Sequence, residues 1–111
     1  MITRYALFEG KVNEGEENAF RAAVTNEILP HWKQFPGALA VRVSYAVKRD
    51  DGATEFPLIL AVSYPDMETV TAALASDVRT RARAATDSVM TRFFTGTIHH
   101  HWMDAEDYED L

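Results

Sequence analysis

The sequence predicts one α+β domain, in which a four-stranded antiparallel sheet carries two helical regions on one face. The main observation is the spacing of the apolar residues along the chain: a two-residue spacing indicates a strand, and a three- to four-residue spacing indicates a helix. These patterns occur in the order β, α, β, β, α, β. The length of 111 residues corresponds to a single domain. Hydrophobic residues make up 47% and charged residues 25%, as in ordinary globular proteins, which excludes a disordered, collagen-like or rod-shaped chain.

The first two elements are a strand and a helix. The strand is expected over Thr3–Val12, because it contains the aromatic and apolar run Tyr5-Ala6-Leu7-Phe8 and leads into a turn at Asn13-Glu14-Gly15. Apolar residues then recur at three- and four-residue steps, namely at Ala19, Phe20, Ala23, Val24, Ile28 and Trp32. We expect Pro30 to kink or end this helix, and Phe35-Pro36-Gly37 to stop it firmly.

The second and third strands should form a hairpin. Leu39–Lys48 alternates between apolar and more polar positions, with Leu39, Val41, Val43, Tyr45 and Val47 on one side. Arg49-Asp50-Asp51-Gly52 is a hairpin turn, since Asp-Gly accepts positive φ, and it leads into Phe56–Tyr64. These two strands are therefore expected to pair antiparallel.

The second helical region opens at Pro65-Asp66, where the Asp66 carboxylate is placed to cap the first turn. Two apolar stripes follow one another, so we expect the helix to restart or bend near Ser76-Asp77. Thr95-Gly96 should end this helix, and Thr97–Met103 is β-compatible and forms the last strand.

This order of elements predicts a ferredoxin-like fold, in which both helices cover one face of the antiparallel sheet. The third strand is apolar on both sides, with Pro57, Ile59, Ala61 and Ser63 opposite the side that carries Leu58, Leu60 and Val62. A face open to water would show polar residues at alternate positions. We therefore predict that the sheet of a second subunit covers the helix-free face, in a twofold dimer with facing sheets.

The charge and composition exclude several classes of function. The net charge is −6, but five of the acids lie in the last eight residues, and the remaining 12 acids nearly balance 11 bases. We therefore expect no basic face for nucleic acid, and we assign residues 1–103 to the domain and 104–111 to an acidic tail. Cysteine is absent, and no run approaches the roughly 20 apolar residues of a membrane span. A cytoplasmic protein with no membrane partner is expected.

Three segments carry a resemblance to a known superfamily. They are Phe35-Pro36-Gly37, Ser63-Tyr64-Pro65-Asp66 and Leu74-Ala75-Ser76-Asp77-Val78-Arg79. Together with the order of elements they make the chain, up to about Asp104, similar to the dimeric α/β-barrel superfamily, in particular to EthD-like proteins and small antibiotic-biosynthesis monooxygenases. The resemblance implies a homodimer that holds a small hydrophobic molecule, often polyketide-like or aromatic, inside the barrel. Related barrels often carry His-Pro-x-His at the helix break, but this chain has Ala75–Val78 there, so that histidine's role is not carried over.

The string His99-His100-His101-Trp102 provides the candidate catalytic residues. On a strand, His99 and His101 point to one face and His100 to the other; the resemblance places the first two toward the barrel. Their ordinary pKa near 6.5 suits proton transfer at neutral pH, with pocket polarity or interface packing as the alternative. A metal site is not expected, because no third ligand is in view. His100 is expected to be a hydrogen-bonded core histidine, and His31 only to close the first helix.

The candidate ligand-binding residues are Arg42, Arg4, Phe8 and Tyr45. A guanidinium in an apolar barrel would hold a carboxylate or phenolate as an anchor, and the two aromatic residues would contribute to the wall, although tyrosine also suits a strand core. Arg79 is a third base that could enter a pocket, but the interpretation favoured for it, and for Arg81 and Arg83, is a solvated, ion-paired helix face with Asp77 and Asp87.

Phosphate loops, nucleotide fingerprints and hydrolase motifs are absent, so we expect no cofactor. The first hypothesis is a cofactor-independent enzyme that oxygenates, cyclises or isomerises a small aromatic or polyketide-like compound. The alternative is a non-catalytic ligand-binding or accessory protein of a catabolic or biosynthetic pathway. A third possibility is a structural subunit whose facing sheets pack without a cavity.

Overall fold

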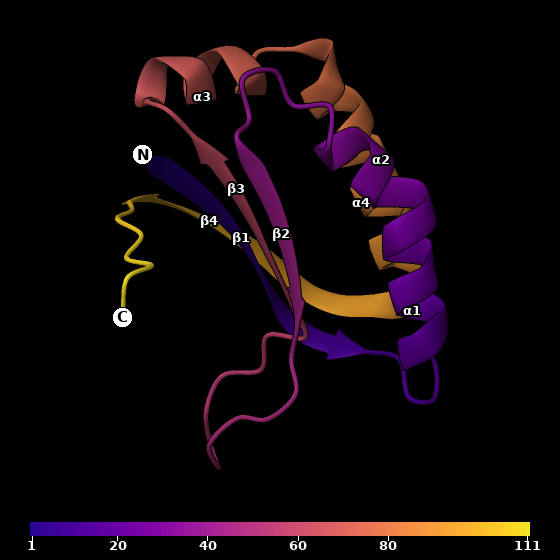
Figure 1. Cartoon of the computed structure of the whole chain (residues 1–111). Coiled ribbons are helices and arrows are strands. Elements are labelled where there is room, and N and C mark those ends of the chain that lie inside the picture. Colours follow the sequence, from indigo (N-terminus) through magenta and orange to yellow (C-terminus); the bar gives the residue numbers. More distant parts are fainter.

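A computed structural model describes residues 1–111 and shows a four-stranded antiparallel sheet with helices on one face (Figure 1). The strands are β1 (Ile2–Val12), β2 (Ala40–Tyr45), β3 (Leu58–Tyr64) and β4 (Phe94–Asp104), in the spatial order β2-β3-β1-β4. All three strand pairs are antiparallel. The predicted ferredoxin-like α+β fold is confirmed.

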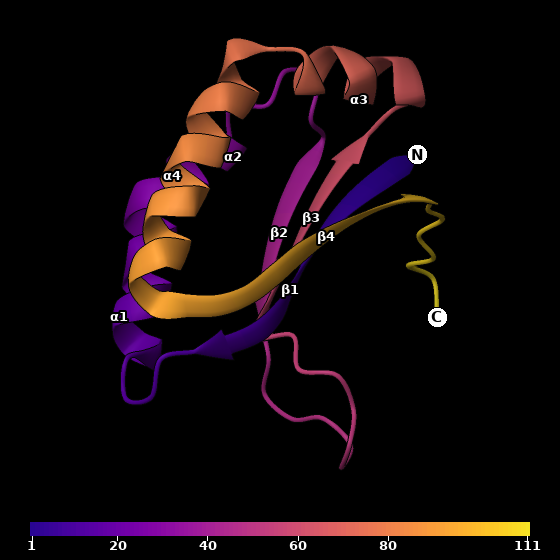
Figure 2. The same ribbon diagram turned by 180° about the vertical axis from the view of Figure 1, so that it is seen from behind.

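The helical segments are α1 (Glu17–Ala23), the π-helical turn η1 (Val24–Ile28), α2 (Leu29–Trp32), α3 (Met67–Leu74) and α4 (Asp77–Phe93). Figures 1 and 2 show α1, α2 and α4 along one face, α3 at one end of the sheet, and no helix over the other face. No helix is long and apolar enough to cross a lipid bilayer.

The hydrophobic core lies between the sheet and these helices. Alternate residues of β3 are buried against the helices, from Leu58 to Tyr64, as the two-residue period predicted. Phe20, Ile28 and Trp32 of the first helical segment and Val89 of α4 supply the other side of the core. The opposite residues of β3, from Ile59 to Ser63, are half-buried and lie on the helix-free face.

The first helical segment does not end at Pro30 but continues to Trp32, and a π turn ends at Ile28, two residues before the proline. In a regular α-helix Pro30 would lack the N–H that bonds the carbonyl of Asn26, and its ring would collide with that carbonyl. We attribute the wider turn at η1 to this conflict. The later stop at Phe35-Pro36-Gly37 agrees with the prediction, and Gly37 has φ +77°.

The β2–β3 hairpin is shorter than the alternation predicted. The last ladder bond runs from Ala46 N to Pro57 O at 3.1 Å, and residues 46–57 form a long loop that projects beyond the sheet (Figure 1). Val47 continues the alternating pattern but is 97% exposed, because no helix reaches far enough to cover it. The predicted turn is present, with Ala53 N donating to Asp50 O at 3.0 Å and Gly52 at φ +80°.

The start and the break of the second helical region agree with the sequence. Thr69 N donates to Asp66 Oδ1 at 2.8 Å, which caps α3, and the chain leaves the helix between Leu74 and Asp77. The predicted ion-paired face of α4 was wrong, since neither Asp77 nor Asp87 lies within 4 Å of an arginine nitrogen. Two of the arginines of that face, Arg79 and Arg83, line a cavity between α4 and the sheet instead.

The last strand begins three residues earlier than expected and pairs with β1 over its whole length, up to Asp104. Gly10 and Gly96 are paired residues in this ladder. A Cβ atom at Gly96 would collide with Glu9 O, and one at Gly10 with Thr95 O. Glycine is therefore required on both strands where β1 and β4 approach each other this closely.

Candidate functional site

A cavity of about 410 Å³ lies between the helix-facing side of the sheet and α4. Residues of β1, β3 and β4 form its floor, and α4, Trp32 of α2 and Phe35 form its roof and wall. The smallest side chains of the lining, Ala6 on β1 and Ala82 on α4, come from its floor and its roof. Larger residues there would close the space, so we attribute the cavity to this pair.

The floor of the cavity is apolar. Phe8, Leu60 and Val62 are at most 5% exposed in the intact fold and project from neighbouring strands. Trp32 and Phe35 add aromatic surface from the first helical segment and the loop that follows it. A surface of this kind binds the carbon skeleton of a small molecule.

Three guanidinium groups line the same cavity. Arg4 comes from β1, and Arg79 and Arg83 come from successive turns of α4. Arg4 lies over the ring of Trp102, 5.2 Å from its centroid, and its Nε is buried without a hydrogen-bond partner. Burial and the nearby charge of Arg79 lower the pKa of Arg4, although it stays cationic. None of the three has a carboxylate within 4 Å.

His100 projects from β4 into this cavity and is partly exposed at its margin. Burial first, and then the positive charges of Arg4, Arg79 and Arg83, lower the pKa of His100 from 6.5 to about 4. The ring is therefore neutral at pH 7. The interpretation of His100 as a hydrogen-bonded core histidine was wrong: its ring makes no hydrogen bond within the chain. The face of the strand to which the His100 side chain points was inferred correctly, but the residues of α4 opposite it are polar rather than apolar.

Tyr64 supplies a phenol to the cavity wall next to Arg4. Burial raises its pKa, and the neighbouring Arg4 charge opposes that shift in part. The phenol is thus a neutral hydroxyl group near neutral pH. Asp87 of α4 is the one carboxylate of the lining.

His99 and His101, the predicted catalytic pair, lie on the helix-free face, as the alternation indicated. His99 Nε2 is 3.1 Å from Glu9 Oε1, and both side chains are about half exposed. Arg42 is also on this face, in the same cross-strand row as His101 but on the opposite edge of the sheet. Three strand spacings separate them, about 14 Å. Within one subunit these groups do not converge on one small ligand.

The four predicted ligand-binding residues lie in three places. Arg4 and Phe8 line the cavity under α4, whereas Arg42 is exposed on the helix-free face. Tyr45 lines a second cavity of about 500 Å³ between α1 and the 46–57 loop, with the Arg21 guanidinium 4.5 Å from its ring centroid. Burial is the main cause that raises the pKa of Tyr45. The chain holds no cluster of three or more potential metal-ligating side chains.

The sequence favoured a solvated helix face for Arg83 and for Arg79, although Arg79 was also a candidate for a pocket, and both line the cavity. A signal was present, because residues 79, 82, 83 and 86 have the three- and four-residue spacing of one helix face, and all four line the cavity. The mixture of arginine, alanine and threonine on that face concealed its direction.

No family model and no curated protein matches the sequence. Solved structures do match the fold. An EthD family protein from Bacillus halodurans is 24% identical, with a TM-score of 0.64 over 89% of this chain and 96% of its own. A dimeric protein of ferredoxin-like fold from Bacteroides fragilis is 11% identical, with a TM-score of 0.65 over 94% and 95% of the two chains. SnoaB from Streptomyces nogalater, described as a cofactor-independent oxygenase, is 13% identical, with a TM-score of 0.61 over 99% and 97%.

These likenesses confirm the predicted fold. The chain shares its ferredoxin-like fold with an EthD family protein and with antibiotic biosynthesis monooxygenases. At this level of identity they carry no residue roles, so the chemistry has to be argued from the cavity itself.

Proposed function

We propose that this protein is a homodimer that binds a small, mainly apolar molecule in the cavity under α4 of each subunit and transforms it without a nucleotide cofactor. The observation that carries the proposal is a cavity of about 410 Å³ in which a neutral imidazole and three guanidinium groups border an apolar floor. The expected reaction is oxygenation, cyclisation or isomerisation of an aromatic or polyketide-like compound. The description of the structural neighbour SnoaB as a cofactor-independent oxygenase supports this kind of chemistry.

The three reaction types share a first step, which is loss of a proton from a phenol or an activated C–H group. The electron pair then stays on the ligand as a phenolate or enolate, and the arginines stabilise its negative charge. The neutral ring of His100 accepts the proton. A negative charge that develops between the guanidiniums offsets their effect on His100, so its pKa rises as the proton moves. In an oxygenation, the carbanion would then give its electrons to dioxygen, the oxidant, as the C–O bond forms.

The dimer is proposed from the helix-free face. Leu7, Ile59 and Ala61 lie in its centre and are only half-buried in the isolated subunit, and Met103 at its edge is 52% exposed. A second copy that presents the same face would remove these apolar groups from water. The Bacteroides fragilis neighbour is described as dimeric.

Sedimentation velocity at micromolar concentration tests the assembly. We expect a dimer for the wild type and a monomer for Leu7→Asp, because the charge would be buried between the sheets. Thr80→Asp on the exposed side of α4 is the matched control and should remain dimeric. A wild-type chain that sediments as a single subunit would refute the facing-sheet dimer.

Ligand binding is tested by blocking the cavity. Ala82→Phe fills the space under α4, whereas Ala84→Phe adds the same ring on the exposed side of the same helix. Each variant is titrated with a panel of naphthols and 1,3-dicarbonyl compounds, and circular dichroism monitors folding. We expect Ala82→Phe alone to lose binding. Equal binding by both folded variants would place the ligand elsewhere.

Catalysis is tested by incubating the same panel with the wild type in air and analysing the products by mass spectrometry. His100→Gln should abolish product formation, while His99→Ala and His101→Ala separate a role on the helix-free face from one in the cavity. Saturable binding without any product would establish the alternative function, a non-catalytic binding or accessory protein.

A further inference from the structure

We propose that Arg4, Arg79 and Arg83 form an anion subsite, and that the ligand of this cavity therefore carries an oxygen anion, a carboxylate or an enolate, on an aromatic body. The inference rests on the proposed function, since it assumes that the cavity under α4 is the binding site, and it specifies the chemical class of the ligand.

The first argument is the balance of charge inside the cavity. Three guanidiniums line it, against one carboxylate, that of Asp87, which is not within 4 Å of any of them. Like charges on facing elements oppose folding unless something compensates them. A bound anion would supply this compensation.

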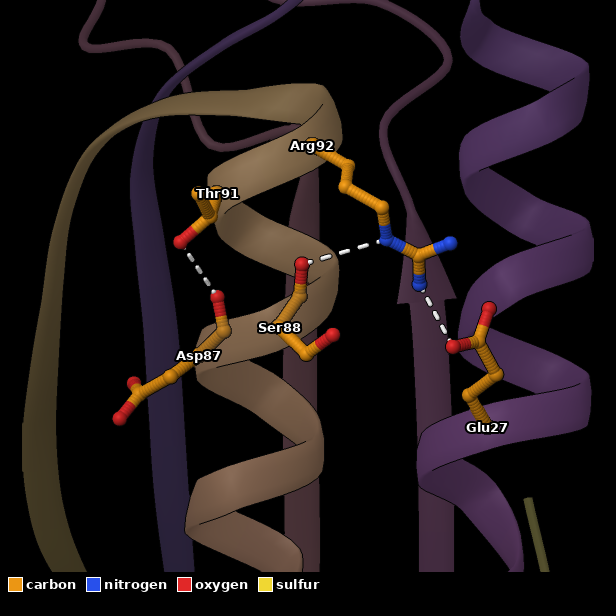
Figure 3. Close-up of polar contacts among 5 residues, drawn as sticks. All are labelled: Glu27, Asp87, Ser88, Thr91 and Arg92. Atoms are coloured by element: carbon orange, nitrogen blue, oxygen red, sulfur yellow. Dashed lines mark hydrogen bonds and ion pairs between the residues drawn. The ribbon is translucent and has the colours of Figure 1, made fainter.

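The second argument is the contrast with Arg92 on the same helix. Arg92 donates to Glu27 at 2.6 Å and to Ser88 O at 3.3 Å, which connects α4 to η1 (Figure 3). Arg49 likewise pairs with Glu55 at 3.3 Å. Arg92 and Arg49 thus find acceptors within the chain, whereas Arg79 and Arg83, which line the cavity, have none. Figure 3 also shows that the side chain of Asp87 points away from Arg92.

The third argument is the buried donor of Arg4. Its Nε is closed off from solvent by the fold and has no acceptor in the chain. Buried donors in native proteins are nearly always hydrogen-bonded, so an unpaired one indicates a missing acceptor. The guanidinium is held in place by the ring of Trp102. A planar anion beside it could accept two parallel N–H bonds.

The position of these groups defines the rest of the ligand. Phe8, Leu60 and Val62 form the floor, whereas Arg79 and Arg83 also border the outer surface of α4. An anionic head group would therefore remain near the cavity opening while an apolar ring system lies against the floor. A bicyclic aromatic acid matches this arrangement in size and polarity.

The test compares 2-naphthoate with 2-naphthamide, which has the same ring system without the charge, by isothermal titration calorimetry. A third ligand, a naphthyl 1,3-diketone, distinguishes an enolate from a carboxylate. For the wild type we expect the acid to bind at least about tenfold more tightly than the amide. Arg83→Gln and Arg79→Gln should each reduce this preference severalfold and leave amide binding unchanged. Arg81→Gln, an exposed arginine on the same helix that does not line the cavity, is the matched control and should keep it.

A second readout does not depend on affinity. Binding of the acid should move the NMR titration of the His100 ring to higher pH, because the anion offsets the arginine charges, whereas the amide should not. Equal affinity for acid and amide would overturn the anion subsite and leave cavity binding intact. If Arg81→Gln lost the preference for the acid as much as the cavity variants do, the anion subsite would also be overturned, because the preference would then come from the overall positive charge of the helix. If neither compound binds, the proposed function itself fails with it.

Discussion

The titration of His100 gives a quantitative prediction about the free protein. Its pKa is about 4 in the folded chain and near 6.5 when unfolded, so the unfolded state takes up the proton first as the pH falls. The free energy of unfolding should therefore decrease from about pH 6.5 toward pH 4. The full difference corresponds to about 3 kcal/mol. Because His100 is partly exposed, solvent screening reduces the expected effect to about 1 kcal/mol.

Urea unfolding at pH 7 and pH 5 measures this contribution by comparing the wild type with His100→Gln, which cannot be protonated there. The wild type should lose about 0.5 kcal/mol more than the variant over this interval, which covers about half of the titration. His101→Gln, on the other face, is the matched control and should behave like the wild type. NMR titration of the His100 ring tests the cause of the lowered pKa. Arg83→Gln removes one of the positive charges that lower it, so this variant should have a higher His100 pKa. A ring that titrates near 6.5 in the wild type would refute the electrostatic description of the cavity.

Further predictions concern the elements that hold the cavity in shape. Gly96→Ala should lower the free energy of unfolding by about 3 kcal/mol, because the added methyl group collides with β1. In the same urea titrations Gly15→Ala, whose methyl group meets no neighbour, should cost about 1 kcal/mol or less. Arg92→Met should cost less than about 1 kcal/mol, and repeating the unfolding in about 1 M salt should abolish that loss. Hydrogen bonds from Thr69 lower the pKa of Asp66, so the wild type should be more stable than Asp66→Asn at neutral pH, and this advantage should vanish as the pH falls through that pKa. A constant advantage at all pH values would contradict the capping role.

The fold could be predicted because local patterns and turn residues agree with the tertiary arrangement. Two-residue alternation in β3 is matched by burial, and Asp66 begins α3 as its side-chain chemistry requires. The overestimated length of β2 has a physical reason. Val47 fits the strand pattern, but alternation does not indicate whether another layer covers a residue.

The site was less accessible to sequence reasoning. The opposite directions of His99 and His100 follow from strand geometry alone and were inferred correctly. The cavity, in contrast, depends on two alanines, Ala6 and Ala82, that are 76 positions apart in the sequence and line the same space only in the folded chain. The rotation of α4 about its own axis, which brings Arg83 to the edge of the cavity, is set by the same long-range packing.

The π turn at η1 has a consequence for how the roof of the cavity can vary. Such a turn holds one more residue than the regular helix needs, and Thr25 and Asn26 of this turn are exposed, so either could be deleted without opening the core. The deletion would remove the surplus residue, so the helical residues on either side would keep their faces and Trp32 would still point to the floor. Pro30 would then lie in a regular helix, where its ring collides with the carbonyl four positions earlier. The surplus residue can therefore leave the chain without turning the roof away from the chamber, provided that the proline is exchanged in the same step.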